Sequence, residues 1–286
     1  MMQPTPSPVQ GEIRVLHKYL WLLALAVLVF IAAMTLSCSS SSNNSTTVCS
    51  TIYNPVGNWQ ITVSQNGGSS VTGYGAIDSA GLALFFDNTP SSGGTGDTLQ
   101  LPLISGNCLF SGNIVAYAQP GGLHSGSVVT DTAEGTITSS TAISGSFSGA
   151  SSGDPSGTFS LTSFSPLSGS ATAVSGAKTA AVQGTFNGQP LVLDLTFTPS
   201  GTDSSMSFTT TNLAGCEAGG TFTQQATSNV FDVSITLMPT CPITGTFTGI
   251  GFESGSDYFS LNNGNSDTYL YANILDGADT FVMEIY

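Results

Sequence analysis

Few residues in this 286-residue sequence are of the types that perform acid–base or nucleophilic chemistry. One of the two histidines, His124, lies in Gly-Gly-Leu-His-Ser-Gly, a segment typical of a solvated loop. Glycoside hydrolases use a carboxylate pair, which an aspartate could form with Glu134, Glu217, Glu253 or Glu284. No spacing singles out such a pair, and no Gly-x-Ser-x-Gly elbow marks a serine nucleophile. The sequence therefore favours a protein without enzymatic activity over a hydrolase.

Metal ligands are equally sparse. The sequence has no Cys-x-x-Cys pair for a transition metal. The run Asn263-x-Asn265-x-Asp267 resembles the start of a calcium loop. However, Thr268 stands at the sixth position, where glycine is needed, and Ile274 at the twelfth, where glutamate is needed. We expect a turn that enters a strand, and no metal or other cofactor.

The first forty residues contain the strongest signal in the chain. Arg14, His17 and Lys18 precede an apolar run, Leu20–Leu36, that contains no charged residue. A short basic region followed by an apolar region and small residues is the layout of a secretory signal. The alternative is an uncleaved transmembrane helix, since 17 residues are near the short limit for a span. Both interpretations place the rest of the chain outside the cytoplasm.

The run ends in Ala33-Met34-Thr35-Leu36-Ser37-Cys38. This motif resembles the lipobox of bacterial lipoproteins, although Thr35 stands where that family usually has leucine. The resemblance implies that the signal is cut before Cys38 and that its thiol receives a diacylglycerol. A polar segment of the kind that tethers lipidated proteins follows, Ser39–Thr47. We therefore expect a membrane partner through a lipid anchor at Cys38. Ser39 does not resemble the aspartate that retains such proteins in the inner membrane, which favours the outer membrane.

The charge of the remaining chain excludes several ligands. Removal of residues 1–37 takes away Glu12, Arg14 and Lys18, which leaves 16 acidic residues, Lys178 and a formal net charge of −15. Nucleic-acid binding requires cations along the phosphates, and carboxylate or phosphate recognition usually requires arginine. We expect no nucleic-acid partner.

Apolar and polar residues alternate through much of the chain after Cys38, and no helical period is sustained there. Alternation indicates half-buried strands, because successive side chains point to opposite faces of a sheet. We predict an all-β, antiparallel fold that is barrel- or sandwich-like. The clearest expected strands are 57–64, 82–86, 97–103, 113–118, 135–138, 143–148, 191–198, 230–237, 268–275 and 280–286.

The chain also repeats itself. Residues 143–149 match 243–249 at an offset of 100, and Leu-x-Leu-x-Phe at 82–86 matches Leu-x-Leu-x-Leu at 191–195. We predict two tandem units of about eight strands each. The predicted organisation is a signal over 1–37 that forms a signal or anchor helix, a tether over 38–56, and units over 57–165 and 166–286.

The repeat bears on the disulfides. If Cys38 is lipidated, four cysteines remain, an even number that suits an oxidising compartment and allows three pairings. If each unit is closed internally, Cys216 pairs with Cys241 and Cys49 with Cys108.

Aromatic residues suggest where a ligand could bind. In the strand over 268–275, alternation places Tyr269 and Tyr271 together on one face, where they could stack on a glycan or contact a protein. Ordinary packing of these tyrosines against neighbouring residues is the alternative. Gly57-x-Trp59 resembles the opening of lipocalins, and avidin-like barrels begin similarly. That resemblance implies a barrel that carries a small apolar ligand, with Trp59 at the site.

These observations predict an exported, lipid-anchored envelope protein that acts as a non-catalytic binding or structural module. The alternatives are a lipocalin-like carrier of a small apolar ligand, a glycan-binding module and a carboxylate-dependent glycoside hydrolase.

Overall fold

The structure is a computed structural model. It describes residues 49, 51–68, 70–87, 98–117, 128–149, 156–164, 175–184, 191–200, 203–210, 215–225, 229–241, 244–254, 269–276 and 279–286. The predicted signal, the lipidation site Cys38 and the tether up to residue 48 lie outside these ranges. In the described ranges no helix is long and apolar enough to cross a membrane.

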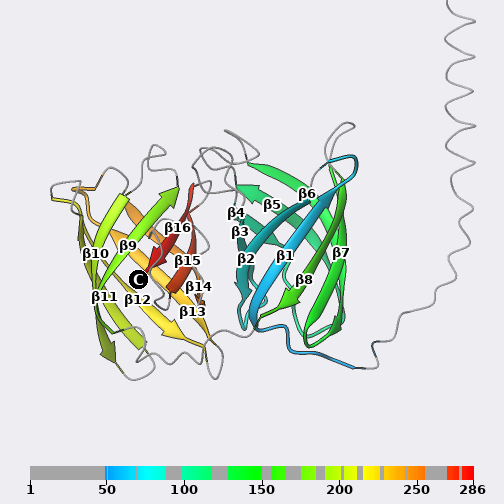
Figure 1. Cartoon of the computed structure of the whole chain (residues 1–286), viewed down its shortest axis with the longest axis horizontal. Coiled ribbons are helices and arrows are strands. Elements are labelled where there is room, and N and C mark those ends of the chain that lie inside the picture. Colours follow the sequence, from blue (N-terminus) through cyan, green and yellow to red (C-terminus); the bar gives the residue numbers. More distant parts are fainter. Residues whose placement is uncertain are drawn as a thin grey trace, which may run out of the picture. The chain divides into compact units, whose positions relative to one another are not determined.

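The described strands form two closed antiparallel barrels, which confirms the predicted all-β class (Figure 1). The first barrel consists of β1 (Gly57–Gln65), β2 (Ser70–Ile77), β3 (Ala83–Asp87), β4 (Thr98–Leu101), β5 (Leu109–Tyr117), β6 (Val129–Ser139), β7 (Ala142–Ser148) and β8 (Gly157–Ser163). The second consists of β9 (Gly176–Gly184), β10 (Leu191–Ser200), β11 (Asp203–Thr210), β12 (Glu217–Gln224), β13 (Val230–Leu237), β14 (Gly245–Ser254), β15 (Tyr269–Asp276) and β16 (Asp279–Ile285).

Each barrel closes by pairing its first strand with its last. In the first barrel, Ile61 of β1 lies opposite both Gly73 of β2 and Leu161 of β8. In the second, Ala180 of β9 lies opposite Leu193 of β10 and Ile285 of β16. Closure satisfies the backbone groups that an open sheet edge would expose.

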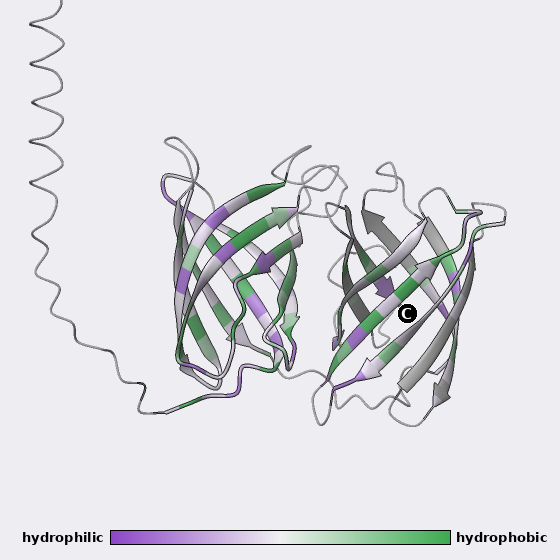
Figure 2. Ribbon diagram, turned by 180° about the vertical axis from the view of Figure 1, so that it is seen from behind, coloured by the Kyte–Doolittle hydropathy of each residue, from purple (hydrophilic) through white to green (hydrophobic). Residues whose placement is uncertain are grey.

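The alternating sequence pattern explains why these strands close around apolar interiors. Figure 2 shows hydrophobic and hydrophilic residues alternating along the described strands. In β13, Phe231, Val233, Ile235 and Leu237 are buried in the core of the second barrel, as the sequence predicts. The intervening residues point outward.

The strand β3 departs from this alternation because all five of its residues are buried. Ala83 and Phe85 pack in the interior of the first barrel, whereas Leu84 and Phe86 point outward into a separate apolar cluster. That cluster also contains Val230, Ile250, Phe252 and Val282 from the second barrel. The rings of Phe86 and Phe252 stack with centroids 6.0 Å apart.

Two hydrogen bonds between the barrels accompany this cluster. The backbone N–H of Ser79 donates to Oε1 of Gln225 over 2.7 Å, and Nδ2 of Asn58 donates to the carbonyl of Glu253 over 3.3 Å. Both bonds join residues far apart in the sequence. The outer face of β2 and β3 is therefore a contact surface inside the molecule.

The sequence matches do not fall on corresponding strands counted from the start of each barrel. Residues 143–149 include β7, the seventh strand of the first barrel, while 243–249 lead into β14, the sixth of the second. Leu84 points outward, but its match Leu193 points inward. Strands rich in glycine and threonine share an alternation of apolar and polar residues wherever they lie in a barrel, so matches between them do not establish a repeat. The duplication and its boundary at 165/166 stay predictions.

Candidate functional site

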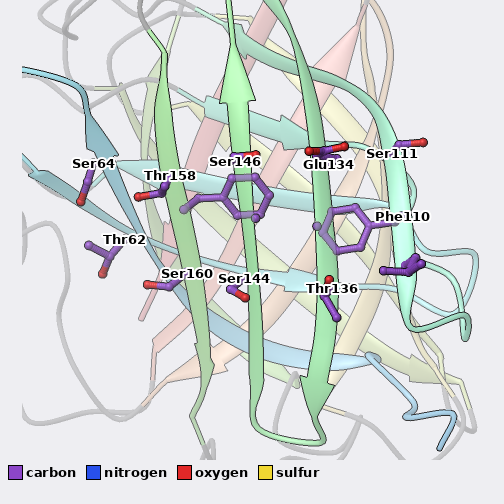
Figure 3. Close-up of a pocket in the computed structure, with 14 residues that line it drawn as sticks. Thr62, Ser64, Phe110, Ser111, Glu134, Thr136, Ser144, Ser146, Thr158 and Ser160 are labelled. Atoms are coloured by element: carbon purple, nitrogen blue, oxygen red, sulfur yellow. The ribbon is translucent and has the colours of Figure 1, made fainter. Parts of the chain in front are cut away.

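The outer face of β1 and β5–β8 carries two cross-strand rows of mostly small hydroxyl side chains (Figure 3). One row runs Thr62, Ser160, Ser144, Thr136 and Leu109, in register from β1 to β5. The other runs Ser64, Thr158, Ser146, Glu134 and Ser111 across the same strands. We call the eight serine and threonine side chains of these rows the hydroxyl wall.

The hydroxyl wall lines an open hollow of about 910 Å³. Neighbouring strands in a sheet lie ~4.8 Å apart and alternate residues along a strand ~6.7 Å apart, so the hydroxyls form a grid with roughly these spacings. A second hollow of about 580 Å³ continues the surface along β5, β6 and β7, past Asn113, Thr132 and Ser148. Together they present repeated donors and acceptors over an extended face.

Glycines at the inward positions of β6 and β7 leave room for two aromatic rings behind the hydroxyl wall. A Cβ on Gly135 would lie 2.2 Å from Cζ of Phe110, and one on Gly145 would lie 2.3 Å from Cζ of Phe159. The two rings therefore lie flat against the neighbouring strand, in space that a larger residue would occupy. Both rings also contribute to the floor of the hollow.

Glu134 is the one charged side chain among the residues that line the larger hollow. A carboxylate accepts hydrogen bonds, and each hydroxyl both donates and accepts. Such a surface suits a neutral ligand rich in hydroxyl groups, because it offers matching hydrogen bonds. It offers no cation to an anionic ligand.

Both predicted disulfides are present. Cys49 is bonded to Cys108 with the Cα atoms 5.7 Å apart, and Cys216 to Cys241 with the Cα atoms 4.4 Å apart. The first bond ties the segment before β1 to the connection between β4 and β5. The second ties the start of β12 to the connection after β13.

Trp59 is 2% exposed and packs inside the first barrel. Its indole N–H donates to the carbonyl of Pro55 over 2.8 Å. Other large side chains share this interior, among them Phe85, Phe110 and Phe159. The described interior positions thus hold protein side chains, which gives Trp59 a packing role. A carrier role for this barrel stays a prediction.

The predicted tyrosine pair lies on β15, and only its backbone register is described. Tyr271 is paired with Phe252 on one side and Glu284 on the other, and both of these neighbours are buried. Tyr269 is paired with Ser254. A glycan- or protein-binding role for Tyr269 and Tyr271 stays a prediction.

The four candidate glutamates are distributed over different surfaces. Glu134 belongs to the larger hollow, and Glu217 is exposed at the start of β12. Glu253 and Glu284 are both buried, but strand alternation points them to opposite faces. Phe252 and Val282 both point outward, into the outer cluster. Glu253 is one residue from Phe252, whereas Glu284 is two residues from Val282. Glu253 therefore points into the second barrel, and Glu284 points outward.

Burial raises the pKa of Glu253 from its ordinary value of 4.5 to about 7. The residue Glu253 is 2% exposed. The carboxyl group of Glu253 therefore binds and releases its proton near neutral pH.

Two remaining candidates, His124 and the run Asn263–Asp267, lie outside the described residues. Among the residues that the structure does describe, no group of three or more histidine, cysteine, aspartate or glutamate side chains could hold a metal ion.

The hydroxyl wall was not predicted from the sequence, although its signal is present there. In Ile143-Ser144-Gly145-Ser146-Phe147-Ser148 the inward positions alternate with serine, and Gly157-Thr158-Phe159-Ser160-Leu161 repeats the pattern with threonine and serine. What the sequence did not reveal is that β1 and β8 are neighbours, which brings Thr62 beside Ser160.

Comparison of the chain with protein-family models, with curated proteins and with solved structures finds no match.

Proposed function

We propose that this protein is exported, anchored in the bacterial envelope by a lipid on Cys38, and acts there as a non-catalytic binding module. The anchor would place both barrels outside the cytoplasm, at the outer membrane in a bacterium with two membranes. The proposed binding surface is the hydroxyl wall of the first barrel, and the proposed ligand class is a neutral glycan.

The pairing of the cysteines is the observation that carries the export and anchoring proposal. Four of the five cysteines form two disulfides within the described structure. Structural disulfides persist in oxidising compartments and are rare in the cytosol. Cys38 is the one cysteine that these bonds do not use, and it directly follows the apolar signal-like run. This is the arrangement that a lipidated cysteine requires.

Metabolic labelling with a fatty-acid analogue tests the anchor. The native chain is expected to take up label, and Cys38→Ala is expected to lose it while both disulfides still form. Cys38→Ala also serves as its own folding control, because Cys38 contributes to neither bond. Equal label in the two proteins would contradict the anchor.

The glycan proposal is supported by the chemistry of the hydroxyl wall. Its side chains are small, they repeat across five strands, and they line an open hollow. A second carboxylate beside Glu134 would be needed for glycoside hydrolysis, and the residues lining the larger hollow include none. Binding without catalysis is the activity that this surface supports best.

Pull-down on neutral polysaccharides, with the lipidated chain in detergent, tests the surface. Ser144→Gln places a larger side chain in the hollow and is expected to weaken binding by tenfold or more, equivalent to about 1.4 kcal/mol. Thr196→Gln makes the same kind of change at an exposed position of β10 and is expected to leave binding intact. Loss of binding in Tyr269→Ala/Tyr271→Ala, with Ser144→Gln unaffected, would move the site to β15 and overturn the proposal.

The two barrels are proposed to descend from one duplicated unit. The matched segments fall in β7 and β14, and in β3 and β10. A duplication in this alignment would be shifted by one strand around the barrel, so that β16 corresponds to β1. Two closed barrels permit such a shift, since β1 pairs with β2 and β8 while β16 pairs with β9 and β15. The opposite facing of Leu84 and Leu193 counts against the match between β3 and β10.

A further inference from the structure

Three of the five exposed large apolar side chains in the described structure belong to one region of the first barrel. Ile52 is 70% exposed, Leu103 63% and Leu109 48%. We call these three residues the apolar rim. The other two exposed residues, Val128 and Met238, lie elsewhere in the chain.

The apolar rim is fixed to the barrel rather than carried on a free segment. The Cys49–Cys108 disulfide joins the segment that contains Ile52 to the one that contains Leu103 and Leu109. Cγ2 of Ile52 lies 3.5 Å from the position that a Cβ on Gly106 would take. The N–H of Ile104 donates to the carbonyl of Gly81 over 2.8 Å, and Ile104 itself is buried in the core.

This end of the barrel carries almost no charge, although the chain has a formal net charge of −14. The described residues 51–56, 78–82, 101–109 and 139–142 include one charged side chain, Asp78. That carboxylate is buried and accepts a hydrogen bond from the N–H of Leu82 over 2.8 Å. Exposed apolar residues therefore stand in an uncharged setting.

The proposed lipid anchor lies close to this region in the sequence. Ten residues separate Cys38 from Cys49. A chain of that length reaches about 40 Å at most when fully extended, and roughly 18 Å as a random coil. Cys49 is in turn bonded to Cys108, the residue before Leu109. The anchor thus holds the apolar rim near the lipid surface at a high effective concentration, so that a weak contact suffices.

We propose that the apolar rim is a membrane-contact surface, which seats the first barrel on the bilayer that holds the lipid of Cys38. This inference rests on the proposed anchor. Ile52, Leu103 and Leu109 enter the interfacial region, where apolar side chains gain by leaving water. The uncharged surroundings avoid the cost of bringing carboxylates to the headgroups.

The same contact would set the position of the hydroxyl wall. Leu109 ends the row that contains Thr136, Ser144 and Ser160, so the wall begins at the apolar rim and extends away from it along β5–β8. A glycan on the wall would lie beside the membrane surface.

Depth-dependent fluorescence quenching tests the contact. Trp59 is buried, and Trp21 lies in the predicted signal, so an introduced tryptophan on the surface reports on its own surroundings. The lipidated chain carrying Ile52→Trp is placed in phosphatidylcholine vesicles whose acyl chains carry bromine. We expect a loss of emission relative to vesicles without bromine.

Val128→Trp provides a matched control, because Val128 is also apolar and 43% exposed. It lies eight residues along the chain from Thr136, the partner of Leu109, which is roughly 26 Å along the strand direction. Its emission is expected to be the same in both kinds of vesicle.

The outcomes separate the two proposals. If the chain carries no lipid and does not bind vesicles, the anchor fails and the membrane contact fails with it. If the lipidated chain binds vesicles but Ile52→Trp is not quenched, the anchor stands and the contact is overturned. Tryptophan emission could instead shift as the amount of protein per vesicle is raised, without quenching by bromine. That result would show that the apolar rim contacts a second copy of the chain, and it would also overturn the proposal.

Discussion

The first barrel has two outer walls of opposite chemistry around one apolar interior. On β3, the outward side chains Leu84 and Phe86 are buried against Phe252 and its neighbours. On β7, the outward side chains Ser144 and Ser146 line an open hollow. Both strands nevertheless contribute inward side chains, such as Phe85 and Phe147, to the same core.

This difference shows that the inward and outward residues of a barrel strand carry separate information. The inward set specifies closure and packing, and it is apolar in both walls. The outward set specifies what each wall meets, which is the other barrel for β3 and solvent or ligand for β7. A substitution at an outward position should therefore have an effect that depends on the wall and not on the strand's place in the sequence.

The largest difference is expected for truncation of the buried outer wall. Phe86→Ala removes a ring that stacks on Phe252 and leaves a cavity, so it should lower the free energy of unfolding by about 3–5 kcal/mol. Urea unfolding of the chain without residues 1–37, followed by the emission of Trp59, measures this loss. An effect below about 1 kcal/mol would contradict the burial of this wall.

A smaller loss of stability is expected for a substitution at Gly145, an inward glycine behind the hydroxyl wall. In Gly145→Ala the new Cβ would meet the ring of Phe159 at 2.3 Å and the carbonyl of Glu134 at 2.4 Å. Overpacking of this kind costs about 1–3 kcal/mol. The same unfolding experiment tests this loss of stability. Ser146→Ala, at the next position of β7, is the control because its side chain points outward. Equal stability of the two variants would show that the Phe159 ring does not need the glycine.

The pH dependence of stability tests the environment of Glu253, the residue after Phe252. Its pKa is raised from 4.5 to about 7 by burial, so the folded state keeps a proton that the unfolded chain loses. Stability from this group is fully present below pH 4.5 and falls as the pH rises to about 7. Above pH 7 the penalty is constant.

Glu253→Gln removes this titration and should become more stable than the native chain as the pH rises through that window. The free energy of unfolding of both proteins, measured by circular dichroism in urea between pH 4 and pH 8, gives the difference. The native chain and Glu253→Gln should converge at the acid end. A constant difference across the range would contradict the raised pKa.

The smallest effect is expected for truncation of the exposed wall. Ser144→Ala and Ser160→Ala each remove a hydroxyl at an exposed position and should change the free energy of unfolding by no more than about 0.5 kcal/mol. Their unfolding midpoints are therefore expected to match the native chain while glycan retention falls. A loss of stability comparable to that of Phe86→Ala would erase the distinction between the two walls.

Much of the fold could be predicted because inward positions follow a period of two. The expected strand over 230–237 coincides with β13, and those over 57–64 and 143–148 nearly coincide with β1 and β7. The strand β2 was missed because Gly73 and Gly75 occupy positions where an apolar residue would signal burial. A Cβ on Gly75 would clash with the carbonyl of Leu84, so the close approach of β3 explains the glycine.

The candidate site was harder to predict because it depends on pairings between distant strands. The row from Thr62 to Leu109 exists only when β1 closes against β8, a contact between residues about one hundred positions apart. The disulfides were predictable, since the proposed internal closure of each unit left one pairing among three. The exposure of Ile52 and Leu103 could not be read from their apolar character, which suggests burial.

Mass spectrometry of the chain extracted from bacterial membranes tests the central proposal most directly. The account predicts an amino-terminal peptide that begins at Cys38 and carries a diacylglycerol, together with Cys49–Cys108 and Cys216–Cys241 and no free thiol. A chain that begins at Met1 with an unmodified Cys38, or with Cys38 bonded to another cysteine, would contradict it.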